Sequence, residues 1–136
     1  MGRPSPPPST RSTFRIRLLA EPHDVVTAHE RSLESSLGLR IDAGGYRERC
    51  PGLFVAEGAT VADQVVVRSG PVLVAAHADV GPFCCLDGPI WIGPAARVNP
   101  HAWLRAGCSV GREGRVGGEI EATVLEAWSN KPHHGF

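Results

Sequence analysis

The densest group of polar side chains that could do chemistry lies near the end of the sequence, in Ser129-Asn130-Lys131-Pro132-His133-His134-Gly135. Histidine is the usual general base near neutral pH. A positioned imidazole beside an amide and an ammonium group could deprotonate a sugar amine or hydroxyl while the cation holds an anion. The alternative interpretation is a solvated histidine-rich tail, because no partner carboxylate is evident beside these histidines.

The spacing of the histidines and glycines does not indicate a catalytic metal site or a glycine-rich loop that binds phosphate. A catalytic zinc needs three ligands that converge on one site. The long step from His77 to His101, followed by the adjacent pair His133-His134 far downstream, does not match such a site. The sequence also lacks a G-x-x-x-x-G-K-[ST] loop and a G-x-G-x-x-G fingerprint. We therefore predict no metal site in this chain.

Composition limits the classes of partner. The chain has 136 residues, with 14 basic and 14 acidic side chains and a net charge of zero. This balance gives no indication of a nucleic acid or an anionic membrane as partner. Neither an apolar run long enough to span a bilayer nor the apolar core of a signal peptide is present. The four cysteines show no C-x-x-C spacing, and a reducing cytoplasm fits best.

The element that must position the polar residues is a repeat of six. An aliphatic residue returns every six positions, with one extra residue near Gly70-Pro71. The series comprises Val55, Val61, Val67, Val74, Val80, Leu86, Ile92, Val98, Leu104, Val110 and Val116. Four places after an aliphatic residue comes a second compact candidate for the interior, as at Ala59, Val65, Ala78, Cys84, Ala96, Ala102 and Cys108. This pattern is typical of a parallel β-helix.

The physical interpretation is that one hexapeptide makes a short strand and a corner, and that three make a triangular coil of about 18 residues. An antiparallel sheet would instead alternate with period two. We therefore predict an all-β fold, a parallel β-helix of about four coils over residues 53–136. His77, His101 and the Arg112–Arg115 segment would lie at exposed corners. The three tryptophans would cover the faces of the prism or a subunit contact, because no basic patch accompanies them.

The N-terminal region predicts a tail, a helix and a linker. Residues 1–12 are rich in proline and serine and are expected to be disordered, and Phe14–Leu19 could form a short strand. Asp24 can cap a helix of about 15 residues that ends near Gly38. Its apolar face must pack on the β-helix or on another domain. The expected units are residues 1–20 as tail, 21–52 as helix and linker, and 53–136 as β-helix.

The repeat deforms after Val116, and the sequence stops at Phe136 without an element that caps the last coil. An uncapped coil exposes an edge of unpaired backbone groups. Either another chain covers that edge or the sequence is a fragment. We expect a fragment.

Two segments carry a resemblance to a known family. Gly88-Pro-Ile-Trp-Ile-Gly-Pro-Ala-Ala-Arg-Val-Asn-Pro100 and Arg115-Val-Gly-Gly-Glu-Ile-Glu-Ala-Thr-Val124 resemble the β-helix domain that follows the nucleotidyltransferase domain in sugar-1-phosphate nucleotidyltransferases. This group includes the bifunctional UDP-N-acetylglucosamine pyrophosphorylase/glucosamine-1-phosphate N-acetyltransferases. The closing SNKPHHGF is similar to the S-N-K-x-H-D-G-F segment of one branch. The resemblance extends over about residues 22–136.

The resemblance implies a left-handed coil, since a period of six alone does not determine the hand. It also implies a homotrimer that binds acetyl-CoA as acyl donor between subunits, with a sugar phosphate or nucleotide sugar as partner. His133 would be the general base on the sugar amine. Asn130, Lys131, His134 and Asn99 would line the substrate site.

Two positions depart from the family pattern. Asn99-Pro100-His101 stands where the acetyltransferases have an arginine before a Pro-Gly pair, and Thr123 replaces an expected lysine. We therefore retain two hypotheses. The first is an acyltransferase-type domain of a nucleotide-sugar enzyme. The second is a non-catalytic β-helix that trimerises and regulates a sugar-1-phosphate nucleotidyltransferase. A zinc-dependent β-helical hydratase is a weaker third.

Overall fold

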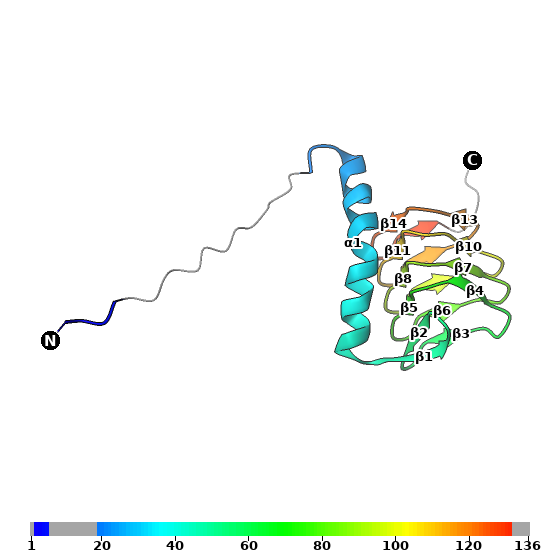
Figure 1. Ribbon diagram of the computed structural model, residues 1–136. Coiled ribbons are helices and arrows are strands. Elements are labelled where there is room, and N and C mark those ends of the chain that lie inside the picture. Colours follow the sequence, from blue (N-terminus) through cyan, green and yellow to red (C-terminus); the bar gives the residue numbers. More distant parts are fainter. Residues whose placement is uncertain (1, 6–18, 132–136) are drawn as a thin grey trace.

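The computed structural model describes residues 2–5 and 19–131, and its main body is a parallel β-solenoid with one helix along its side (Figure 1). The predicted parallel β-helix is confirmed. The tail expected over residues 1–20 and the strand expected at Phe14–Leu19 lie largely outside the described residues. Leu19 and Ala20 are described and have no regular secondary structure.

Three sheets form the walls of the solenoid. Sheet A has the order β1 (Tyr46–Cys50), β2 (Leu53–Ala56), β5 (Val72–Val74), β8 (Ile90–Ile92), β11 (Cys108–Val110) and β14 (Val124–Leu125). Sheet B has the order β15 (Asn130–Lys131), β12 (Arg115–Val116), β9 (Arg97–Val98), β6 (Asp79–Val80) and β3 (Thr60–Val61). Sheet C has the order β13 (Glu119–Ile120), β10 (Trp103–Leu104), β7 (Cys85–Asp87) and β4 (Val66–Ser69). Each successive complete coil adds one strand to every sheet.

The core is the stack of aliphatic residues that the period of six predicts. Val80 lies in register with Val98, and Leu86 with Leu104, so each residue stacks on its equivalent in the next coil. These side chains are buried, and Cys84 and Cys108 are buried among them as predicted. Burial of such apolar side chains away from water is the main source of stability for a solenoid. His77 and His101 are exposed at corners, also as predicted.

The register slip lies slightly earlier than the sequence indicated. Val67 pairs with Leu86, but Ser69 pairs with Asp87, so the extra residue is Arg68, in a bulge of β4. Gly70-Pro71, near which the sequence predicts the slip, is aligned with Gly88-Pro89 one coil further on. A side chain at Gly88 would lie 2.9 Å from the carbonyl carbon of Gly70, which explains why only glycine fits at this corner.

The repeat continues beyond Val116 as a shorter coil. Leu104 pairs with Ile120, and Val110 pairs with Leu125, and both separations in sequence are shorter than three full hexapeptides. The solenoid therefore completes a fourth coil and begins a fifth with β14 and β15. The period of six no longer detects these strands because the corners between them have lost residues.

Helix α1 (Pro22–Ala43) packs on the outer face of sheet A (Figure 1). Leu33 and Leu37 are buried against Leu73 of β5. The helix is longer than we predicted, because it begins at Pro22 and continues through Gly38. Asp24 lies in its first turn, where its carboxylate accepts the backbone N–H groups of Ala20 and Glu21. No helix in the described ranges is long and apolar enough to cross a bilayer.

Residues 38–52, which we interpreted as a linker, contain the end of α1 and the strand β1. β1 pairs antiparallel with β2, in contrast to the parallel pairing elsewhere in sheet A. It therefore covers the edge that the first coil would otherwise expose in this sheet. Arg49 of β1 adds an ion pair of 2.6 Å to Asp63, which follows β3.

Candidate functional site

The predicted substrate residues within the described part of the chain gather on sheet B. Asn99 directly follows β9 and is half-buried, and its backbone N–H donates to the carbonyl of Val116 at 2.8 Å. Asn130 and Lys131 form β15 and are exposed. Each strand of sheet B is one rung of the solenoid wall. Asn130 and Lys131 lie two rungs from Asn99, or about 10 Å given the spacing of β-strands. His133 and His134 lie outside the described residues.

The rung between these residues carries an arginine that sequence reasoning had assigned to a corner. Arg115 lies within β12, where it pairs in register with Asn130 on one side and with Arg97 of β9 on the other. It precedes the inward residue Val116 and therefore belongs to the outer face of sheet B. Arg97 stands in the same relation to Val98. We call Arg97 and Arg115 the basic column.

Both guanidinium groups of the basic column are exposed, and neither forms an ion pair within the described ranges. Like charges on directly opposed residues destabilise a sheet. Asp79 of β6 is in register with Arg97, but no ion pair joins these two described residues. The basic column is therefore a place where an anion would relieve repulsion between neighbouring strands.

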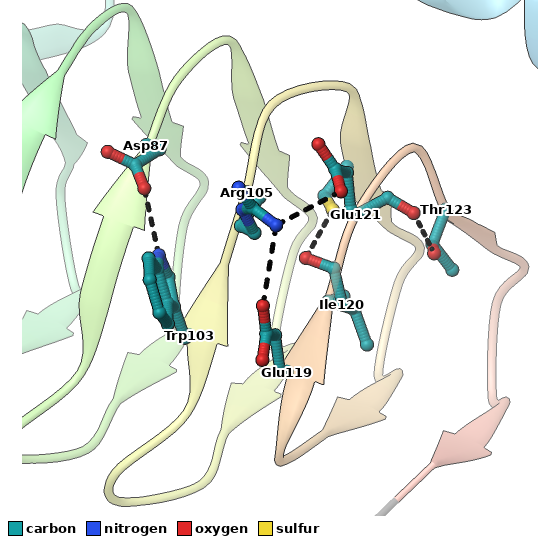
Figure 2. A network of polar contacts seen from close by, with 8 residues as sticks. Asp87, Trp103, Arg105, Glu119, Ile120, Glu121 and Thr123 are labelled. Carbon is teal, nitrogen blue, oxygen red and sulfur yellow. Dashed lines mark hydrogen bonds and ion pairs between the residues drawn. The ribbon is translucent and has the colours of Figure 1, made fainter.

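Sheet C shows how the same protein treats arginines that have a structural role (Figure 2). Arg105 lies 3.5 Å from the Glu119 carboxylate and 3.3 Å from that of Glu121. The indole N–H of Trp103 donates to Asp87 at 2.8 Å, and Arg68 forms a 3.6 Å ion pair with the same carboxylate. These polar groups of sheet C thus satisfy one another, whereas the arginines of the basic column on sheet B have no ion pair in the described residues.

An aromatic pair stands at the corner that follows sheet B. The rings of Phe83 and His101 are stacked, with centroids 5.1 Å apart and an interplanar angle of 16°. Phe83 follows β6, and His101 follows β9 after Asn99. Phe83 is 58% exposed, so its ring is accessible from solvent. The repeat predicts the corner position of His101 but gives no signal for its stacking partner.

A second polar contact joins α1 to sheet A. His29 Nε2 lies 2.9 Å from Ser109 Oγ, at one end of a groove of about 460 Å³ between the helix and the last strands of the sheet. Ser109 is buried, and burial lowers the pKa of His29. A neutral imidazole and a hydroxyl satisfy each other here, so the contact anchors the helix. Trp91 also lines the groove, and its Nε1 is buried without a hydrogen-bond partner in the described part.

Asn99 and Thr123 occupy the two positions where the family that the sequence resembles has cations. The Thr123 hydroxyl donates to the carbonyl of Glu121 at 2.7 Å and is thus engaged with its own loop. Residues 2–5 and 19–131 contain no group of three or more His, Cys, Asp or Glu side chains that could hold a metal ion.

The Arg-Val dipeptides at 97–98 and 115–116 are the sequence signal that could have revealed the basic column. They are one full coil apart in sequence, which places them on adjacent rungs. Comparison of the chain with protein-family models, with curated proteins and with solved structures finds no match.

Proposed function

We propose that this chain is an acyltransferase-type β-helix domain of a nucleotide-sugar biosynthesis enzyme, which transfers the acetyl group of acetyl-CoA to an amino-sugar phosphate. The observation that carries the proposal is the place of Arg115. It is an exposed arginine with no ion pair in the described residues, on the strand next to Asn130 and in the sheet whose strand β9 Asn99 directly follows. A parallel solenoid that presents such residues on one wall supports this class of function over a purely structural wall.

The proposed roles follow from charge and reach. Arg115 would pair with the phosphate of the acceptor, because a guanidinium can donate two parallel hydrogen bonds to phosphate oxygens. Asn130, which is in register with Arg115, and Asn99 would donate to sugar hydroxyls. Lys131 is in register with the inward residue Val116, so it would add its positive charge from the end of the solenoid rather than from the face of Arg115. His134, which follows these residues in sequence, would belong to the same substrate site.

His133 would act as general base. The sugar amine attacks the thioester carbonyl carbon of acetyl-CoA, so that a C–N bond forms and the C–S bond breaks. His133 takes the proton that the amine loses and returns it to the departing CoA sulfur. The products are the N-acetyl sugar phosphate and CoA, and no metal or oxidant enters the balance. A base of this kind contributes about 10²- to 10⁴-fold in rate.

The test is release of CoA thiol from acetyl-CoA in the presence of glucosamine 1-phosphate. We expect release by the wild-type chain, and a loss of about 100-fold or more in kcat for His133→Ala. His77→Ala is the matched control, because it removes an exposed corner histidine outside sheet B. Equal rates for wild type and His133→Ala would exclude His133 as base.

A non-catalytic role is the second candidate, and two observations favour it. Asn99 and Thr123 replace the cations expected at those positions, and the last coil leaves Val124 and Trp128 exposed by 38% and 69%. Such apolar exposure fits a surface that another subunit covers. A trimeric mass in light scattering, together with the absence of CoA release, would favour a trimerisation and regulatory domain of a nucleotidyltransferase.

A further inference from the structure

The Phe83–His101 pair lies beside the basic column rather than apart from it. β6, β9 and β12 are consecutive rungs of sheet B. Phe83 stands at the corner after β6 and His101 at the corner after β9, while Arg97 lies on β9 itself. The short stretch of chain from Arg97 to His101 spans at most about 13 Å when extended. A single ligand can therefore reach both the ring pair and the Arg97 guanidinium.

The chemistry of these groups is complementary to two parts of one molecule. The exposed ring of Phe83, already stacked on an imidazole, offers an aromatic face on which another planar ring can stack. Arg97 offers a guanidinium that has no ion pair in the described ranges. A planar aromatic base joined through a sugar to phosphates has both parts at a comparable separation.

We propose that the Phe83–His101 pair and Arg97 form a nucleotide-binding surface on sheet B. The base stacks on the ring pair, and the diphosphate pairs with Arg97. This inference rests on the proposed function in so far as it places the nucleotide next to Arg115, where the acceptor phosphate would bind. Two ligands share the required chemistry, namely CoA, with its adenine diphosphate portion, and a uridine-diphosphate sugar.

One acidic group faces the same place and gives the proposal an internal test. Asp79 is exposed and in register with Arg97 on the rung toward Phe83. Its carboxylate repels a diphosphate that binds to Arg97. Asp79→Asn should therefore tighten nucleotide binding, whereas a surface that does not bind nucleotides would be indifferent to this change.

The experiment is calorimetric titration of the chain with CoA, with UDP-N-acetylglucosamine and with inorganic pyrophosphate at low salt. At least one nucleotide should bind, and Phe83→Leu should weaken it about fivefold or more, since stacking of one base on an aromatic ring is worth at least this much. Phe83→Leu should leave pyrophosphate binding unchanged, whereas Arg97→Met should weaken both kinds of ligand. The preferred nucleotide identifies the source of the diphosphate.

The matched control is His77→Ala, because His77 is also exposed at a corner with positive φ, but at the corner before β6, at the opposite end of that strand from Phe83. It should change nothing. The proposal is overturned if neither nucleotide binds, if His77→Ala weakens binding as much as Phe83→Leu, or if Phe83→Leu changes only the oligomeric mass. Circular dichroism of each variant verifies that it is folded.

This binding test is separable from the acetyl-transfer test. CoA release that is insensitive to Phe83→Leu, with unchanged nucleotide affinity, would contradict only the nucleotide surface. Nucleotide binding that depends on Phe83 and Arg97, without any CoA release, would contradict only the proposed acetyl transfer.

Discussion

The arginines of the solenoid differ in whether a carboxylate faces them. Arg105 and Arg68 on sheet C form ion pairs with carboxylates. Arg97 and Arg115 on sheet B face each other in register and have no such partner in the described residues. A surface ion pair contributes little to stability, but an unpaired arginine column attracts anions. The distinction cannot be made from net charge, which is zero for the whole chain.

His29 should make stability depend on pH. Burial lowers its pKa below the ordinary value of 6.5, so the unfolded chain binds more protons than the folded chain once the pH falls below that value. The contribution of this pKa difference to the free energy of unfolding is fully present above about pH 6.5. It is lost as the pH falls toward and through the folded pKa. We expect Tm to decrease between pH 7 and pH 5, and to decrease less in His29→Gln.

The control for this measurement is His77→Gln, since His77 is exposed. It should retain the wild-type dependence of Tm on pH. If His29→Gln and wild type lost the same number of degrees over this range, the buried contact between His29 and Ser109 would not hold in solution.

At the scale of elements, the structure explains why α1 is longer than its sequence signals indicate. Gly38 is a frequent helix terminator, but it lies between Leu37, which is 1% exposed, and Ile41, which packs on the same cluster. Burial of these side chains on sheet A outweighs the cost of a glycine within the helix, which is about 1 kcal/mol. Tertiary packing of this kind is invisible to a sequence pattern that considers the helix alone.

Leu37 should therefore be a main anchor of the helix. Truncation of Leu37 to alanine leaves a cavity between α1 and sheet A, and we expect a loss of about 2–5 kcal/mol in the free energy of unfolding. Leu39→Ala is the matched control, since Leu39 is 72% exposed, and it should change stability by less than about 0.5 kcal/mol. Urea unfolding followed by circular dichroism measures both. Equal losses in the two variants would mean that α1 does not dock through Leu37.

The strands were predictable wherever the coil keeps its three full hexapeptides. Each inward aliphatic position from Val74 to Val116 is buried, because stacking in a regular coil demands one apolar residue per side. The exceptions have local causes. A bulge at Arg68 displaces the register, and shortened corners before Ile120 and Leu125 hide the last strands from a fixed period.

At the scale of the whole molecule, the solenoid brings together residues that are one coil apart in sequence. Asn130 and Lys131 are predicted together because they are adjacent in sequence, and Asn99 is added only by the family resemblance. The solenoid places Asn99, at the end of β9, two strands of sheet B away from them. The basic column and the Phe83–His101 stack were missed for a different reason. Both depend on residues that point outward from the coil. The repeat constrains only the inward positions, so it gives no signal for these residues. The general base assigned to His133 stays a prediction.

The proposed function requires that sheet B binds the phosphate of an amino sugar through Arg115. The most direct measurement is calorimetric titration with glucosamine 1-phosphate and with unphosphorylated glucosamine, for the wild-type chain and for Arg115→Met. Arg47→Met is the matched control, since Arg47 is an exposed arginine of β1 on sheet A. We predict that Arg115→Met weakens binding of the phosphate sugar about tenfold or more, because it removes a charge-assisted hydrogen bond. The control and the titration with glucosamine should show no such change. Equal affinity of wild type and Arg115→Met for glucosamine 1-phosphate would contradict the proposed role of Arg115.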